Sequence, residues 1–218
     1  MELKHISPRQ RYIIDVSIAT ALSWKNPDGL KAALTDALDA GLSINELNEE
    51  IVHLYCYVGF APSCRATIIL MNLIDERCAC GIHDEQGREA SPVNEDESKY
   101  SRGEKLQMFC AGATAEQLRS GFFGFNPLLD KCLKEHLFAD IFARDLLSPV
   151  EREMITVSAL ASIEEPMVES HFGGALNVGV TVEQLHELLR LVGGKTSSDV
   201  ETLSLNRLQH TINNRQKI

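Results

Sequence analysis

The chain repeatedly places apolar residues three and four positions apart, which is the spacing of an amphipathic helix. After Ser148, for example, Glu153, Val157, Leu160 and Ala161 fall on one helical stripe. Sustained alternation of apolar and polar residues, the signature of a half-buried strand, occurs nowhere in the sequence. The pattern therefore predicts an all-α fold.

Two predicted helix starts have nearly the same amino-acid sequence. Residues 7–17 read SPRQRYIIDVS and residues 148–158 read SPVEREMITVS, with six of eleven positions identical and an offset of 141. Each has a serine that can cap the helix, a proline at the first helical position, and Gln10 or Glu151 placed to complete a capping box. Both stretches are predicted to begin helices.

The similarity continues further along the chain. ALDAGLSINELNE (37–49) aligns with ALNVGVTVEQLHE (175–187) at an offset of 138. Gly41 and Gly179 stand where a helix end needs a left-handed residue, and a second capping box follows each glycine. We predict two related helical-hairpin units, at 1–75 and 97–218, with further helices after Pro62 and after Ser197-Ser198.

The units are separated by residues 76–96, whose polar, glycine-containing and acidic composition predicts a linker. Helical periodicity returns over 97–146, where we predict three helices, at 97–112, 113–123 and 126–145.

Composition and charge narrow the classes of function. The 218 residues are 44% hydrophobic and 24% charged, as in ordinary soluble proteins, and the net charge is −10. A negative protein without a basic stripe repels phosphate backbones, so no nucleic-acid partner is expected. No apolar run reaches the length of a membrane span, and the first residues lack the order of a signal peptide. We expect a cytoplasmic protein with no membrane partner.

The six cysteines, at 56, 64, 78, 80, 110 and 132, have no regular spacing. A disulfide framework is therefore not expected. Cys78 and Cys80 form one close pair, but without a second pair of ligands they do not define a zinc site. No metal and no cofactor is predicted.

Residues 97–205 resemble the carboxymuconolactone decarboxylase family of the alkyl hydroperoxidase D-like superfamily. The resemblance rests on Tyr100-x-Arg102-Gly103, on FADIFARDLLSPVERE, and on HFGGALNVGVTVEQLHE, which begins at His171. Residues 7–75 resemble a second, degenerate copy. The resemblance implies an all-helical fold, tandem repeats, and a homo-oligomer, most simply a trimer.

The same resemblance implies that Glu153 and His171 face a site between helices. Their counterparts in the first copy are Tyr12 and Ala33, so that only the second copy could transfer protons in this way. The chain also departs from its relatives. Glu164 and Met167 stand where the peroxidase branch has its two cysteines, and Ala139, Asp140, Phe142 and Asp145-Leu146 replace the residues usual in the decarboxylase branch.

His171 shares an apolar stripe with Met167, Ala175 and Val178, so it could be a catalytic group or a core histidine whose hydrogen bonds are satisfied. Glu153 could pair with it or turn to water. Asp140 and Arg144, four residues apart, could form a surface ion pair, or they could face the site, where Arg144 would clamp a substrate carboxylate. The candidate catalytic residues are His171, Glu153 and Asp140, and the candidate substrate-binding residues are Arg144, Tyr100 and Arg102.

Three functions remain open. The first is a cofactor-free lyase or isomerase acting on a small unsaturated carboxylic acid or lactone, with His171 and Glu153 moving the proton. The second is a thiol redox protein that uses Cys78 and Cys80. The third is a non-catalytic binding or scaffold protein.

Overall fold

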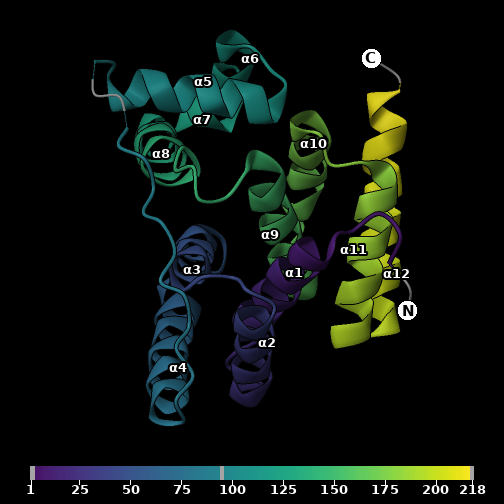
Figure 1. The fold of residues 1–218 in the computed structure, drawn as a ribbon. Coiled ribbons are helices and arrows are strands. Elements are labelled where there is room, and N and C mark those ends of the chain that lie inside the picture. Colours follow the sequence, from purple (N-terminus) through teal and green to yellow (C-terminus); the bar gives the residue numbers. More distant parts are fainter. Residues whose placement is uncertain (1–2, 94–95, 217–218) are drawn as a thin grey trace.

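The computed structural model describes residues 3–93 and 96–216, and within these ranges it consists of helices and connecting segments without a strand (Figure 1). The all-α prediction is confirmed. No helix among the described residues combines the length and the apolar character that a bilayer crossing requires. The elements are α1 (Pro8–Ala21), α2 (Pro27–Asp39), α3 (Ile44–Val58), α4 (Phe60–Ala79), α5 (Lys99–Ala111), α6 (Ala115–Arg119), α7 (Phe122–Phe125), α8 (Pro127–Cys132), the π-helix η1 (Leu133–Phe142), α9 (Pro149–Ser162), α10 (Val168–Val178), α11 (Val182–Lys195) and α12 (Ser198–Arg215).

Helices α1 and α9 pack against each other at the centre of the molecule (Figure 1). Both begin with the predicted capping box, at Ser7 and at Ser148. One hydrophobic cluster takes Ile13 from α1 and Ile155 from α9, and the other takes Ile14 and Met154 from the same two helices. Each core is therefore built from both halves of the chain.

The helix starts repeat at the offsets found in the sequence. α1 and α9 begin 141 residues apart, and α3 and α11, like α4 and α12, begin 138 residues apart. Gly41 and Gly179 adopt positive φ angles of 92° and 106° at the turns before α3 and α11. These regularities agree with the predicted duplication, which stays a prediction, as does the division into 1–75, 76–96 and 97–218.

The structure corrects several predicted boundaries. Gly59, at φ 89°, ends α3 and begins α4 at Phe60, before Pro62, and α4 then runs to Ala79 inside the predicted linker. The helix predicted at 113–123 is divided into α6 and α7 at Ser120 and Gly121. The helix predicted at 126–145 divides into α8 and η1.

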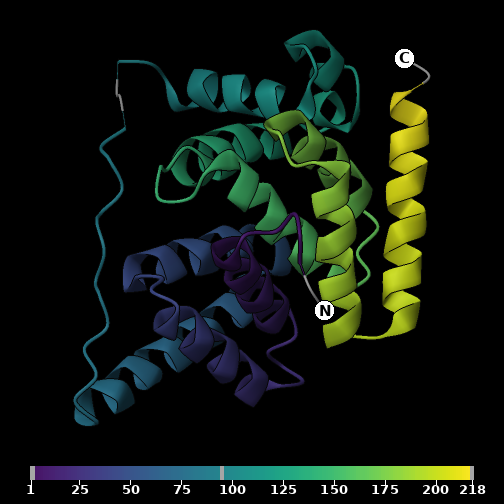
Figure 2. The ribbon, with the colours of Figure 1, turned by 45° about the vertical axis from the view of Figure 1, so that its right-hand side comes forward.

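The segment after α4 runs outside the helices toward α5 (Figure 2). Its carbonyl groups at Glu85 and Gln86 accept hydrogen bonds of 3.0 Å from the first backbone N–H groups of α3. Because those N–H groups have no partner within their own helix, the segment completes the start of α3. Ser91 adds hydrogen bonds to the Asp145 carboxylate, which precedes α9.

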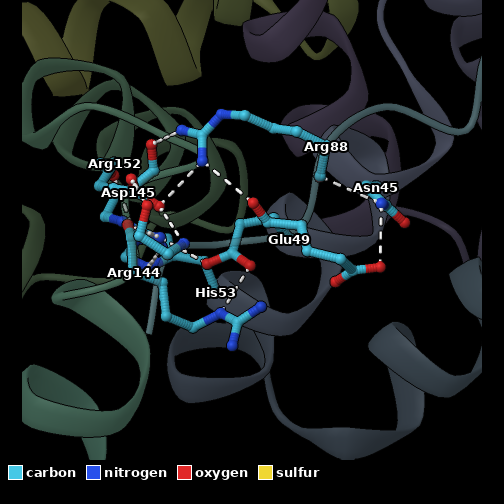
Figure 3. Close-up of polar contacts among 9 residues, drawn as sticks. Asn45, Glu49, His53, Arg88, Arg144, Asp145 and Arg152 are labelled. Carbon is cyan, nitrogen blue, oxygen red and sulfur yellow. Dashed lines mark hydrogen bonds and ion pairs between the residues drawn. The ribbon is translucent and has the colours of Figure 1, made fainter. Parts of the chain in front are cut away.

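A buried polar network joins α3 to α9 (Figure 3). The Arg152 side chain is fully buried and its Nη2 lies 2.5 Å from Glu49 Oε1, while Arg144 Nε lies 2.8 Å from Glu49 Oε2. His53 contacts the Arg152 carbonyl oxygen at 3.2 Å and Thr156 Oγ1 at 3.0 Å. Burial, and then the Arg152 charge, hold the pKa of His53 well below its ordinary value. The imidazole is therefore neutral at neutral pH.

Helix α5 approaches η1 closely at Gly103. A Cβ atom at this position would lie 1.8 Å from the Lys134 carbonyl oxygen, so only glycine fits. Lys134 itself is fully buried, with its Nζ 2.9 Å from Asp130 and 3.1 Å from Glu104. The ten residues of η1 follow the rare π-helical pattern, in which each hydrogen bond spans five residues.

Substitution of Gly103 by alanine is expected to destabilise the fold, because the backbone of η1 must move to admit the methyl group. Overpacking of this kind costs roughly 1–3 kcal/mol. Thermal unfolding monitored by circular dichroism measures the change. Gly194→Ala is the control, since a Cβ there has no neighbour within 4 Å, and equal melting temperatures for the two variants would contradict the close approach.

Substitution of Glu49 by leucine should destabilise the protein by about 3–5 kcal/mol, because it leaves the buried Arg152 guanidinium without its carboxylate. The double variant Glu49→Leu/Arg152→Leu should recover most of this loss, since it buries no unpaired charge. Urea unfolding compares the two variants with the unmodified protein. A double variant that is no more stable than the single one would show that the pairing is not the cause.

Candidate functional site

Glu153 lies inside the molecule on the stripe predicted from the sequence. Glu153 is 3% exposed, and its neighbours on the stripe, Val157, Leu160 and Ala161, are buried. The carboxylate packs on the backbone of α10 at Gly174, where a Cβ atom would lie 3.2 Å from Glu153 Oε2. The small residue at 174 therefore leaves room for the carboxylate between α9 and α10.

His171 of α10 meets this carboxylate. Its Nδ1 lies 3.1 Å from Glu153 Oε2, and its side chain is 24% exposed. An ionised carboxylate only accepts hydrogen bonds, so Nδ1 carries the proton of this contact. Nε2 is then the nitrogen through which the ring can accept or donate a further proton.

The pair opens into a cavity of about 400 Å³, which we call the His171 cavity. Its wall comes from α3, α5, α6, α7, α8, η1, α9 and α10, and is mostly apolar. The lining residues are Tyr57, Gln107, Cys110, Ala111, Leu118, Phe122, Phe123, Leu129, Leu133, Leu137, Phe138, Glu153, Met167, Ser170, His171 and Gly174. A cavity of this size and character suits a small organic ligand.

The cavity is also lined by two polar side chains, Gln107 and Tyr57, that are not among the site residues predicted from the sequence. Gln107 is 3% exposed, and its Oε1 is buried without a hydrogen-bond partner in the described parts of the chain. Tyr57 stands edge-on to the His171 ring, with centroids 5.2 Å apart. Burial, and then the Glu153 charge, raise the pKa of Tyr57 well above its ordinary value, so that its phenol stays protonated.

The cysteines do not form a redox pair in this cavity. Cys110 is its one thiol, and burial raises the pKa of that thiol to about 12, which leaves it protonated and unreactive at neutral pH. Cys78 and Cys80 are exposed at the end of α4, outside the cavity lining, where Cys78 Sγ lies 3.9 Å from His83 Nδ1.

The predicted pair Asp140 and Arg144 faces a different part of the molecule. Asp140 binds Lys99 at 2.7 Å and lies 3.6 Å from His136, and Arg144 binds Glu49. Both side chains line a separate cavity of about 440 Å³ beside α3. The structure therefore does not bring this pair to His171 and Glu153.

Tyr100 and Arg102 also form their hydrogen bonds outside the His171 cavity. The Tyr100 hydroxyl donates to Asp130 at 2.7 Å and accepts from Lys134 at 2.8 Å. Arg102 Nη1 donates to the Glu97 carbonyl at 2.5 Å. The Tyr100 contacts hold α5 to α8 and η1, and the Arg102 contact holds the start of α5.

No local pattern points to Tyr57, because it belongs to the first half of the chain and reaches the site only through the contact of α3 with α9. Phe122 and Phe123 of α7 form part of the cavity wall. In the described ranges no group of three or more His, Cys, Asp or Glu side chains is placed to hold a metal ion.

Comparison with known proteins agrees with the resemblance found in the sequence. Residues 127–193 match the carboxymuconolactone decarboxylase family. No curated protein matches the chain. A crystal structure from Burkholderia xenovorans LB400, of a protein provisionally assigned as a gamma-carboxymuconolactone decarboxylase subunit, superposes with a TM-score of 0.55 at 19% identity, over 98% of this chain and 81% of the other.

At this identity the superposition establishes a shared fold, and the family match is confined to residues 127–193. The matched residues include η1, α9, α10 and most of α11, and so contain both Glu153 and His171. The chain thus has the fold of that structural relative, and its residues 127–193 are similar to the carboxymuconolactone decarboxylase family.

Proposed function

We propose that the protein is a cofactor-free lyase or isomerase that acts on a small unsaturated carboxylic acid or lactone. The observation that supports this most is the contact between His171 and Glu153 at the wall of an apolar cavity. A charge inside such a cavity interacts more strongly with its neighbours than it does in water, so a single positioned imidazole can have a large effect.

In a decarboxylation the bond between the substrate carbon and its carboxylate breaks, and its electron pair passes into the unsaturated system as CO₂ leaves. The protonated His171 then donates the Nε2 proton to a carbon of the resulting anion, and Glu153 holds the ring through Nδ1. An isomerisation uses the same nitrogen, first as base and then as acid.

Gln107 and Tyr57 are the proposed orienting groups. The unpartnered Gln107 Oε1 can accept a hydrogen bond from a substrate hydroxyl or carboxyl group. The neutral Tyr57 phenol can donate to a developing oxyanion. Asp140, Arg144, Tyr100 and Arg102 are not included in this proposal, since their contacts lie elsewhere.

The thiol redox alternative has no observation in its favour, because the cysteines lie apart from the cavity or are protonated within it. A non-catalytic binding role differs from the proposal only in the absence of turnover. Screening of unsaturated carboxylic acids and lactones, with CO₂ release and ultraviolet absorbance as readouts, distinguishes the two.

Substitution of His171 by alanine should abolish turnover of a substrate found in that screen, since it removes the proton donor, while ligand binding and the helical circular dichroism spectrum change little. Glu153→Gln should reduce kcat by roughly 10²–10⁴-fold, because it disturbs the protonation of the ring. Tyr12→Phe, at the position that corresponds to Glu153, is the control. Full activity of His171→Ala would refute the mechanism.

A homo-oligomer, most simply a trimer, is proposed as well. Phe60, Ile68 and Met71 form an apolar stripe on α4 and are 70%, 54% and 55% exposed. A contiguous apolar surface of this kind is typical of an interface.

Because the family resemblance implies a trimer, light scattering is expected to give about three times the chain mass of 24.2 kDa. Ile68→Glu/Met71→Glu should lower that mass, because it places charges in the interface. Asn72→Glu, an exposed neighbour on the same helix, should not change it. A monomer at micromolar concentration would contradict the proposal.

A further inference from the structure

A third cavity lies between α1, α2, the end of α11 and the start of α12. Its volume is about 540 Å³, and we call it the Lys195 cavity. It is lined by Asp15, Ile18, Ala19, Leu22, Lys25, Asn26, Gly29, Ala32, Ala33, Asp36, Ser162, Glu164, Lys195, Thr196, Ser197 and Val200. None of these residues lines the His171 cavity, so the two are separate sites.

The two cavities are built from corresponding positions. From α2, the Lys195 cavity takes Gly29, Ala32, Ala33 and Asp36, and from α10 the His171 cavity takes Met167, Ser170, His171 and Gly174, each pair 138 residues apart. Lys195 at the end of α11 and Tyr57 near the end of α3 stand at the same offset. The Lys195 cavity is therefore the counterpart of the His171 cavity in the first half of the chain.

The side chains at these corresponding positions have different chemistry. Ala33 replaces the imidazole of His171, Lys195 replaces the phenol of Tyr57, and Asp36 replaces Gly174. The acid–base pair is absent, and charged groups of both signs stand in its place.

Asp15 supplies a carboxylate that forms two long ion pairs and leaves one oxygen without a hydrogen bond. The residue is 8% exposed, and its Oδ1 is buried without a hydrogen-bond partner in the described ranges. Lys195 Nζ lies 3.6 Å from Oδ1, beyond hydrogen-bond reach, and Arg11 lies 3.5 Å from the other oxygen. A ligand with an N–H donor can supply the missing hydrogen bond to Oδ1.

The opposite charge is available at the cavity mouth. Lys25 and Lys195 are both exposed, and α12, a helix of 18 residues, begins at the wall after its cap Ser197. The positive end of the helix dipole and the two ammonium groups favour an anion at this end. Asp36 and Glu164 are the remaining charged groups of the lining, and Ile18, Leu22, Ala33 and Val200 give it an apolar surface.

We propose that the Lys195 cavity binds a small zwitterion of the free α-amino acid class. The ligand ammonium group binds Asp15 and Asp36, the carboxylate binds Lys25 and Lys195 at the start of α12, and the side chain lies on the apolar surface. This site does not depend on the proposed chemistry at His171.

Isothermal titration calorimetry with the twenty common amino acids, one at a time, tests the proposal on the full chain. At least one is expected to bind with a Kd tighter than about 1 mM. The matched carboxylic acid without the amino group and the matched amine without the carboxylate should each bind at least about tenfold more weakly, because each lacks one charged partner.

Asp15→Asn and Lys195→Met should each weaken amino-acid binding by about tenfold or more. Lys195→Met changes an exposed side chain and is expected to leave the melting temperature unchanged, which separates loss of binding from loss of fold. His171→Ala is the matched control and should bind the amino acid as the unmodified protein does. Absence of binding by all twenty amino acids, equal binding of the matched acid or amine, or loss of binding in His171→Ala would overturn the proposal.

Discussion

The ion pair between Arg152 and Glu49 sets the rotation of α9 about its own axis. Adjacent residues on a helix point about 100° apart, so the direction of Arg152 fixes the direction of Glu153. Arg152 points toward α3, where Glu49, His53 and the Arg144 carbonyl oxygen surround it. Glu153 consequently points toward α10 and His171. The candidate site thus depends on a pairing that is not itself part of the site.

The different chemistry of the two cavities follows from the elements that line them. Helices α5 to α8 and η1 supply a largely apolar wall to the His171 cavity. The wall of the Lys195 cavity comes instead from α1, α2 and the junction of α11 with α12, and several of its polar side chains are exposed. Charged groups are poorly tolerated in the first setting unless they are paired, and exposed ones remain hydrated in the second. The segment 97–146 therefore gives the His171 cavity its apolar character.

Much of the fold could be predicted because its signals are local. Ser7, Ser43, Ser148 and Thr181 cap their helices as the sequence indicated, since a capping box depends on residues only three positions apart. The meeting of His171 and Glu153 could also be anticipated, because both lie on inward stripes of adjacent helices.

Other placements depend on residues far along the chain, and local spacing could not determine them. The spacing of Asp140 and Arg144 places them on one face, but their partners Lys99 and Glu49 decide where that face lies. The π-helix depends on tertiary packing that no local pattern encodes, including the close approach of Gly103 to the Lys134 carbonyl. Tyr57 reaches the site from 96 residues before Glu153, with no sequence feature to connect them.

The position of Tyr57 affects how this chain can change in evolution. The first half lacks the histidine and the glutamate of the second, so considered alone it would be free to lose further residues or to be deleted. Yet it provides one wall of the His171 cavity and the carboxylate that pairs with Arg152. A substitution in α3 would therefore alter the His171 cavity or the Arg152 ion pair as well. The first half can change only within limits that the second half sets.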